Sequence, residues 1–310
     1  DHRHPGPGRT GGFAFLMHPD VQPPSAFFQP GIELLLSRHR DWLGQARIGL
    51  LSHRAAVDAG GRSTAERIRT ETGLRLTALF GPEHGFEVAA AAGQSVRDGK
   101  HAQWGIPLYS LYGENQRPTS AMLDAIDVLL FDLQDIGVRA YTYVSTLRYA
   151  LEAAAENAKP VIVADRPIPL PNTADGPGLD PDQESFVGCI RAPLIYGMTP
   201  GETALWLKAD LGLNLDLRIA PMQDYRRPVS RGEQWPPWIP PSPRIRTWKT
   251  AACFAATVFT EGLPLIDNGT GTDQVFQVLG MPRTNAFALS EAAGSLRLPG
   301  VQLIPCAFMP

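Results

Sequence analysis

The chain has 310 residues and carries 28 Lys and Arg against 31 Asp and Glu, which gives a formal net charge of −3. This balance, without any Lys/Arg-rich run, argues against nucleic acid as a partner, and no apolar run approaches the ~18 residues of a membrane span. The three cysteines, Cys189, Cys253 and Cys306, are far apart and odd in number, so we interpret them as core thiols rather than disulfide, metal or redox sites.

Residues 1–26 are rich in Gly and Pro, and we expect them to form a poorly ordered leader. They lack the apolar core and the small-residue cleavage site of a signal peptide. The histidines in this stretch have no paired spacing, so no metal site is expected there. The structured part of the chain is therefore predicted to begin near residue 27.

Four runs rich in Leu, Ile and Val are predicted to be strands. Each is apolar on both faces, as the strands of a parallel sheet covered by helices must be. The runs are RIGLLSH (47–53), LRLTALF (74–80), IDVLLFD (126–132) and KPVIVAD (159–165). Helical patterns alternate with them, one starting with a capping box at Ser63 and another over residues 146–157. This alternation predicts an α/β fold with a Rossmann-like, doubly wound parallel sheet.

Polar side chains follow each predicted strand at its carboxyl end, where open α/β sheets bind their ligands. They are His53, Glu83 with His84, Asp132 with Asp135, and Asp165 with Arg166. We expect these side chains to converge on one edge of the sheet. The turn after the first strand contains neither of the Gly-rich phosphate-binding patterns, so no nucleotide or other cofactor is expected.

The segment FDLQDIGVRAYTYVSTL (131–147) adds Arg139, Tyr141 and Tyr143 to the two aspartates. A loop of this composition can bind a polyol. The alternative is an Asp–Arg network that only orients the loop, because ion pairs also organise loops without taking part in chemistry. The same two interpretations apply to Arg166 and Asp175, which lie in a loop too rich in proline for a helix or a central strand.

The character of the sequence changes near residue 189. Beyond it, a helix is predicted to start at Thr199, with Pro200 at the first helical position and Glu202 completing a capping box. A chain of this length forms one large or two medium domains. We therefore predict a Rossmann-like domain over residues 27–188, which carries the candidate site, and a smaller α/β domain over residues 189–310.

Several longer motifs occur in a fixed order along the chain. They are GRST (61–64), ALFGPEHGF (78–86), IPLYSLYG (106–113), FDLQDIGVRAYTYVSTL (131–147), DRPIP with DGP (165–169, 175–177), SFVG with GMTPGE (185–188, 197–202) and PPSPRIRT (240–247). In this order they resemble the NamZ-type exo-β-N-acetylmuramidases over roughly residues 31–310.

The resemblance implies a bacterial glycoside hydrolase that removes β-1,4-linked N-acetylmuramic acid from the non-reducing ends of peptidoglycan fragments. It implies a Rossmann-like domain and a smaller α/β domain with the site in the cleft between them. It also suggests a periplasmic or secreted protein, although this chain shows no signal peptide and leaves a cytoplasmic location open. Because the family pattern runs on past the equivalent of Pro310, we expect the second domain to be incomplete at its C-terminal end.

Three departures from the family pattern leave the exact glycan open. SHRAA (52–56) stands where the family usually has a Thr-Asn-Gln-Thr-Gly turn, so two amides that can bind a sugar are missing. Thr270 replaces an arginine, and Tyr196 replaces the usual histidine.

Glycoside hydrolysis needs an acid for the leaving oxygen and usually a second carboxylate. Glu83 is the predicted acid because it lies in a turn fixed by Gly and Pro at the end of a strand. Asp132 or Asp135 is the predicted second carboxylate. If the strands that lead to Glu83 and Asp132 are neighbours, their ends lie ~5 Å apart, which favours a retaining mechanism with Asp132; inversion with Asp135 is the alternative.

The other site residues are predicted to bind the substrate. Arg139 suits the lactyl carboxylate of muramic acid, which a guanidinium can hold in two parallel hydrogen bonds. Tyr141 and Tyr143 offer hydroxyls or a stacking face, and His84 orients Glu83 or binds the sugar. The full set is His53, His84, Arg139, Tyr141, Tyr143, Arg166 and Asp175.

Two other classes of function stay open at this point. A non-catalytic saccharide-binding protein with a degenerate site is compatible with the altered turns. A metal-dependent hydrolase built on His53, Glu83, His84 and Asp132 is less well supported, because no H-E-x-x-H-like spacing occurs, and no metal is expected.

Overall fold

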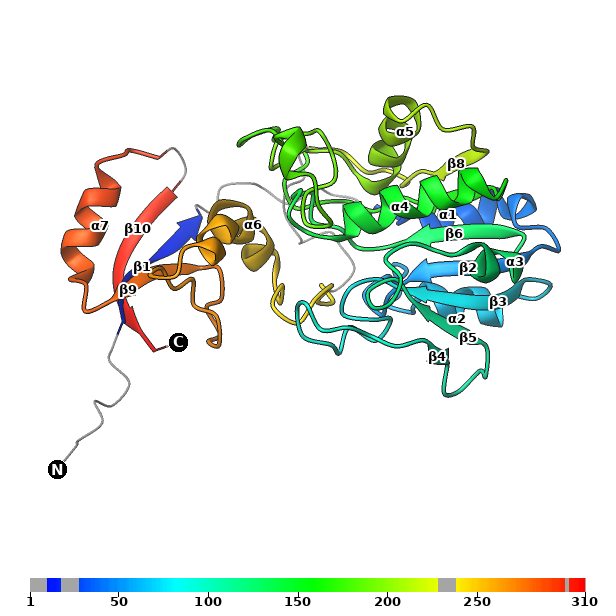
Figure 1. The fold of residues 1–310 in the computed structure, drawn as a ribbon, viewed down its shortest axis with the longest axis horizontal. Helices are drawn as coiled ribbons and strands as arrows, with labels where there is room; N and C mark the ends of the chain where they lie inside the picture. Colours follow the sequence, from blue (N-terminus) through cyan, green and yellow to red (C-terminus); the bar gives the residue numbers. More distant parts are fainter. Residues whose placement is uncertain (1–9, 18–27, 228–237, 299–300, 310) are drawn as a thin grey trace. The chain divides into compact units, whose positions relative to one another are not determined.

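The computed structural model describes residues 10–17, 28–227, 238–298 and 301–309 (Figure 1). The chain forms two compact units. We call Pro23–Arg246 the central unit, and Asp1–Gln22 together with Thr247–Pro310 the terminal unit.

The central unit is built on a sheet whose described strands have the order β4-β5-β3-β2-β6-β7-β8. The strands are β2 (Arg47–Ser52), β3 (Arg75–Gly81), β4 (Gly99–Lys100), β5 (Pro107–Ser110), β6 (Val128–Asp132), β7 (Val161–Ala164) and β8 (Leu217–Ala220). All neighbours pair in parallel except β4, which runs antiparallel to β5. The four predicted strands are confirmed, and the sequence interpretation did not anticipate β4, β5 and β8.

Helices cover the sheet because both faces of its central strands are apolar. Consecutive residues of β6, Leu129 and Leu130, are both fully buried although their side chains point to opposite faces. On one face α1 and α2 place Ile32 and Ile68 in a cluster with Leu130. The helices of the unit are α1 (Gly31–Arg38), α2 (Thr64–Thr70), α3 (Ser120–Asp124), α4 (Tyr143–Glu156) and α5 (Pro200–Asp210), with short 3₁₀ turns at Arg40–Trp42 and Pro181–Gln183. The prediction of a doubly wound α/β fold is confirmed.

Both predicted helix starts are present. The Ser63 hydroxyl accepts a hydrogen bond from the Glu66 amide at 3.2 Å and caps α2. At α5 the reciprocal capping box forms between Thr199 and Glu202. None of the described helices combines the length and apolar character needed to cross a membrane.

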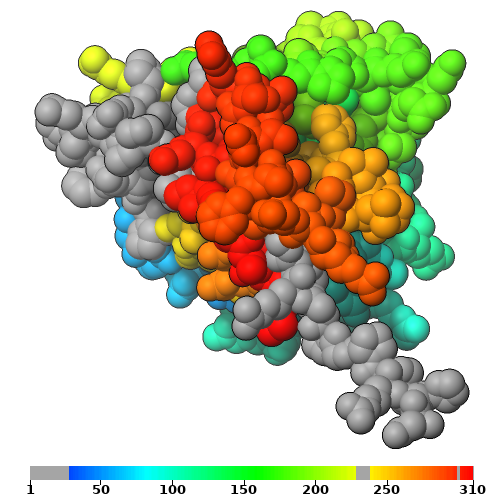
Figure 2. Space-filling view, turned by 90° about the vertical axis from the view of Figure 1, so that its left-hand side faces the viewer, coloured from blue at the N-terminus to red at the C-terminus, as the bar shows by residue number. Residues whose placement is uncertain are grey.

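The terminal unit contains a three-stranded antiparallel sheet in the order β10-β1-β9. Its elements are β1 (Thr10–Met17), α6 (Trp248–Thr257), a 3₁₀ helix (Val258–Gly262), β9 (Val278–Pro282), α7 (Ala286–Gly294) and β10 (Val301–Phe308). Asn285 caps α7 by accepting from two backbone amides. Figure 2 shows this unit in space-filling form, with its C-terminal part in orange and red.

The domain organisation differs from the sequence prediction in two places. The expected leader contains β1, which pairs with β10 on one side and β9 on the other, and the rest of residues 1–26 lies outside the described part. The expected boundary at residue 189 is wrong, because residues 189–246 belong to the central unit. The reason is β8, which adds to the parallel sheet beside β7 from Val161↔Leu217 to Ala164↔Ala220.

Candidate active site

The Gly-Pro-Glu-His-Gly segment forms a tight turn at the end of β3. The Gly85 amide donates to the Pro82 carbonyl at 2.9 Å, and His84 adopts a left-handed φ of 70°. A Cβ on Gly81 would lie 2.7 Å from the amide nitrogen of Phe86, so only glycine fits at the start of this turn. The backbone thereby fixes Glu83 and His84, and both side chains are buried.

The Glu83 carboxyl is held by donors from three other segments. One oxygen accepts from the Gly93 amide at 2.9 Å, and the other accepts from the Thr142 hydroxyl at 2.6 Å. The Tyr112 hydroxyl lies within reach as a third partner; burial and then the Glu83 carboxylate raise the pKa of Tyr112. Sequence reasoning missed Gly93, Thr142 and Tyr112, although Thr142 lies inside the YTYVSTL motif just before α4.

His53 follows β2 and is almost completely buried. Its Nε2 accepts from the Gln134 amide at 2.9 Å, and its Nδ1 lies 3.4 Å from the Tyr143 hydroxyl. A backbone amide can only donate, so the proton of a neutral ring must reside on Nδ1. Burial, followed by the charges of Arg166 and His84, lowers the pKa of His53 well below its ordinary value. The imidazole is therefore a neutral group that fixes the loop after β6.

Tyr141 and Tyr143 form an edge-on pair with ring centroids 4.7 Å apart. The Tyr143 hydroxyl donates to the Pro241 carbonyl, and the Tyr141 hydroxyl lies beside that of Ser242. Burial raises the pKa of both tyrosines, and Glu83 and Asp135 raise it further. The PPSPRIRT segment thus packs against the predicted site. The carboxyl groups of Glu83 and Asp135 both lie near this tyrosine pair.

Asp132 is fully buried and engaged in an ion pair. Arg166 donates through Nε to one carboxylate oxygen and through Nη2 to the other, the latter at 3.0 Å. The Thr64 hydroxyl donates to the second oxygen at 2.5 Å. This network ties the ends of β6 and β7 to the start of α2. Both oxygens of Asp132 are occupied by protein donors.

Asp135 has a different environment from Asp132. One of its oxygens accepts from the Ile136 amide at 2.7 Å, and the other accepts from the Tyr196 hydroxyl at 2.6 Å. Burial raises the pKa of Asp135 to about 6, against the opposing effect of these hydrogen bonds. Tyr196, one of the departures from the family pattern, is therefore a direct partner of a predicted catalytic residue.

Arg139 and Asp175 organise the Pro-rich loop. The Arg139 guanidinium donates to the carbonyls of Pro177, at 3.1 Å, and of Ala192. The carboxylate of Asp175, which is exposed, accepts from the next amide in the chain at 2.6 Å. Of the two interpretations left open by the sequence, the contacts of Arg139 and Asp175 favour residues that orient the loop over residues that bind a substrate.

The order of the strands separates the ends of β3 and β6. β2 lies between them and pairs with both. Two strand spacings amount to ~9.5 Å, so the premise that these strands are neighbours is wrong. The argument for a retaining mechanism with Asp132 loses its basis.

In the part of the chain that the structure describes, no group of three or more His, Cys, Asp or Glu side chains is arranged to hold a metal ion. After β2, β3 and β6 the structure brings together the side chains of His53, Glu83, Asp135, Tyr141 and Tyr143. Three further residues contact this group: Thr142 binds Glu83, the Gln134 amide binds His53, and Ser242 lies beside Tyr141.

Comparison with known proteins agrees with the motifs. A family model described as the N-terminal part of the exo-β-N-acetylmuramidase NamZ matches residues 48–249, and the C-terminal model matches residues 252–310. The chain belongs to the NamZ family. It is 39% identical over 283 residues to the peptidoglycan β-N-acetylmuramidase NamZ of Bacillus subtilis strain 168, covering 91% of this chain and 68% of that protein.

Two solved structures of DUF1343 family proteins from Bacteroides fragilis are also similar to this NamZ family chain. One has a TM-score of 0.86 and 34% sequence identity, and the match covers 93% of this chain and 74% of the other. The second has a TM-score of 0.72 and 29% identity, covering 84% and 69% of the two chains. The predicted family and fold are both confirmed.

Proposed function

We propose that this protein is a glycosidase that releases N-acetylmuramic acid from the non-reducing ends of peptidoglycan fragments. Its NamZ family membership and the name of its Bacillus subtilis relative support this function. The observation that carries the proposal is the Glu83 carboxyl. It is 7% exposed, fixed by a tight turn and oriented by hydrogen bonds to both oxygens.

Glu83 acts as the general acid in this proposal. A glycosidase acid gives its proton to the leaving oxygen as the glycosidic bond breaks. The Gly93 amide can only donate, whereas the Thr142 hydroxyl can donate or accept. The two carboxyl oxygens offer about four lone pairs, so Gly93 and Thr142 can keep donating while the acidic proton lies on a lone pair that faces the leaving oxygen, and Thr142 holds the carboxyl in one orientation through the reaction.

Asp135 replaces Asp132 as our candidate for the second carboxylate. Asp132 is fully buried and ion-paired with Arg166, which makes it an anchor of the site, whereas the hydrogen-bond partners of Asp135, the Ile136 amide and the Tyr196 hydroxyl, are neutral. Asp135 lies near the same tyrosines as Glu83, and its pKa of about 6 allows the ionised form at neutral pH. Arg139, with its guanidinium engaged by loop carbonyls, is proposed to shape the loop.

The test is hydrolysis of 4-nitrophenyl β-N-acetylmuraminide, beside the matching glucosaminide, with and without a chelator. We expect turnover that survives chelation and a kcat/KM at least about tenfold higher for the muraminide, since a tenfold preference requires only ~1.4 kcal/mol. Binding of the disaccharide without turnover of either substrate would instead support the saccharide-binding alternative. Loss of turnover on chelation would point to the metal-dependent hydrolase.

A further inference from the structure

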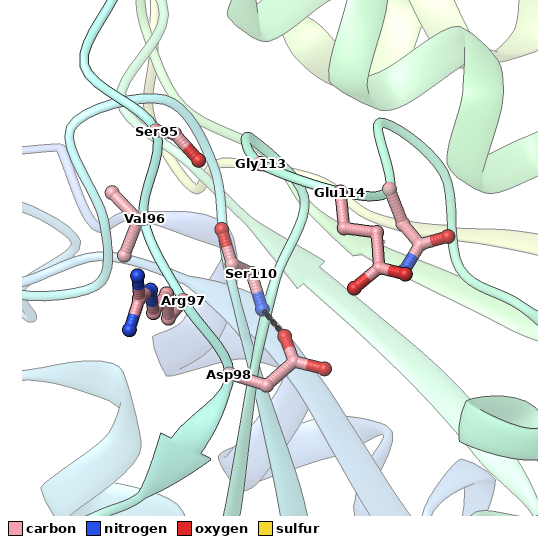
Figure 3. A pocket seen from close by; sticks show the side chains of 8 residues that line it. Ser95, Val96, Arg97, Asp98, Ser110, Gly113 and Glu114 are labelled. Atoms are coloured by element: carbon pink, nitrogen blue, oxygen red, sulfur yellow. Dashed lines mark hydrogen bonds between the residues drawn. The ribbon is translucent and has the colours of Figure 1, made fainter.

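A polar pocket of about 560 Å³ lies at the end of β5 in the central unit (Figure 3). It is lined by Ser95, Val96, Arg97, Asp98, Ser110, Gly113, Glu114 and Asn115. Its volume falls within the range of small-molecule sites. None of these residues has a role in the site described above.

The shape of the pocket is fixed by bonds between its two walls, residues 95–98 and 110–115. The Val96 amide donates to the Tyr112 carbonyl at 2.8 Å, and the Ser110 amide donates to the Asp98 carboxylate at 2.7 Å, the bond drawn in Figure 3. A Cβ on Gly113 would lie 2.4 Å from the Val96 carbonyl oxygen, so the close approach of the walls requires glycine.

Both walls lead directly to Glu83. The Gly93 amide that binds the Glu83 carboxyl lies two residues before Ser95, and Tyr112, its third partner, lies in the other wall. The end of β5 lies beside the end of β3, where Gly81 pairs with Ser110.

The strand order places the pocket and the other site residues on opposite sides of Glu83. β5 lies on one side of β3, whereas β2 and β6, which lead to His53 and Asp135, lie on the other. A general acid acts on the oxygen that joins two sugars, so one sugar lies on each side of its carboxyl group. With Glu83 as the acid and Asp135 beside the sugar that is released, the pocket lies on the side of Glu83 that is left for the departing sugar.

The lining favours a neutral, hydroxyl-rich ligand. The carboxylates of Asp98 and Glu114 can accept hydrogen bonds from sugar hydroxyls, and the Asn115 amide can both donate and accept. One guanidinium, that of Arg97, stands against the two carboxylates, which disfavours an anion. Val96 is the sole large apolar side chain among the lining residues.

We propose that this pocket binds the neutral sugar on the leaving-group side of the scissile bond. The proposal rests on the proposed muramidase function and assigns it a second sugar site. Glu114 and Asn115 supply the hydrogen bonds that distinguish a sugar leaving group from a smaller one.

The test compares two substrates in the double variant Glu114→Gln/Asn115→Ala. One is the disaccharide of N-acetylmuramic acid β-1,4-linked to N-acetylglucosamine, and the other is the 4-nitrophenyl muraminide, whose leaving group carries no sugar. We expect kcat/KM for the disaccharide to fall about tenfold or more, which corresponds to the loss of one or two hydrogen bonds, and kcat/KM for the aryl substrate to change less than about twofold.

A matched control is Glu156→Gln/Asn157→Ala, which changes the same pair of residue types at the end of α4 and should leave both substrates unaffected. An equal fall for both substrates, or no fall for either, would overturn the assignment of the pocket. Failure of the unaltered protein to hydrolyse either substrate would refute the muramidase function itself, and the pocket assignment with it.

Discussion

Glu83 and His84 lie in a turn that the surrounding residues force on the backbone. A non-glycine residue with positive φ costs on the order of 1–3 kcal/mol, and such residues persist where neighbouring contacts over-determine them. Here the His84 carbonyl accepts from the Ala90 amide at 3.1 Å, and its Nδ1 lies 2.9 Å from the Ala90 carbonyl. These contacts compensate the strain at His84 locally, next to the Glu83 carboxyl that accepts from Thr142.

Thr142 is predicted to be a positioning residue for Glu83. Thr142→Val keeps the shape of the side chain but removes the hydroxyl that holds the carboxyl at 2.6 Å. We expect kcat to fall about tenfold, since a hydrogen bond to a charged group contributes roughly 1.5–3 kcal/mol. Thr142→Ser restores the hydroxyl and should recover most of kcat. Equal losses in the two variants would contradict this role.

Asp135 should give the protein a measurable dependence of stability on pH. Its pKa is about 6 in the folded protein against 3.8 ordinarily. Between these values the folded protein retains a proton that the unfolded chain has released, so the free energy of unfolding falls as pH rises and the contribution is lost above about pH 6. Asp135→Asn should therefore gain stability relative to the unaltered protein from pH 4 to pH 7, by up to ~3 kcal/mol.

Urea unfolding at several pH values measures this difference. The pKa of Asp165 is also raised to about 6, but Asp165 is present in both proteins, so its contribution cancels in the difference. Asp127→Asn is the control: hydrogen bonding to Arg47 lowers the pKa of Asp127 to about 2, so its contribution is constant above pH 5. A difference between Asp135→Asn and the unaltered protein that does not change with pH would rule out the raised pKa.

The residues of the site were only partly predictable from the sequence. Glu83 stands out because Gly and Pro flank it at the end of an apolar run. Its partners do not, since Gly93 and Thr142 are common residue types brought in by separate loops. Arg139 lies in the segment densest in functional side chains, yet its guanidinium binds carbonyls of a loop some 40 residues away, at Pro177 and Gly178. Such pairings depend on loop geometry, which local sequence does not encode.

At the scale of elements, apolar runs located four strands but could not order them. A parallel strand that follows a helix can be added on either side of the strand before it. In the structure β2 lies between β3 and β6, the strands formed by the next two predicted runs. β8 was missed because only its last residue is buried, so its pattern lacks a continuous apolar run. The capping residues Ser63 and Thr199 were predictable because helix caps are local.

The buried ion pair of Asp132 and Arg166 is predicted to hold β6, β7 and α2 together. Arg166→Met leaves the Asp132 carboxylate, which is fully buried, without its partner. We expect a loss of about 3–5 kcal/mol in the free energy of unfolding, because an uncompensated charge remains in the interior. The double variant Asp132→Asn/Arg166→Met should recover part of that loss.

Chemical denaturation of the unaltered protein, Arg166→Met and Asp132→Asn/Arg166→Met measures these changes in the free energy of unfolding. Arg117→Met removes one partner of an exposed ion pair with Glu156 and should cost about 0–1 kcal/mol. If Arg166→Met were no more destabilising than Arg117→Met, the buried pair would not be the anchor that we infer.

At the scale of the whole molecule, the two ends of the chain build one unit. β1 pairs with β10 from Thr10↔Phe308 to Met17↔Val301, so its partners lie almost 300 residues away. The Gly- and Pro-rich residues around β1 led to the expectation of a leader, because a strand that depends on so distant a partner has no local signal. The family resemblance, in contrast, rested on motifs between residues 61 and 247, almost entirely in the central unit, and was confirmed.

The central claim is that Glu83 is the acid of a glycosidase, and the most direct measurement is kcat for the muramic acid–glucosamine disaccharide in Glu83→Gln. We predict a fall of about a hundredfold or more, the usual scale of general acid catalysis, with folding intact. The same exchange at Glu87, which is exposed and four residues away, should leave kcat unchanged. Wild-type activity in Glu83→Gln would contradict the account.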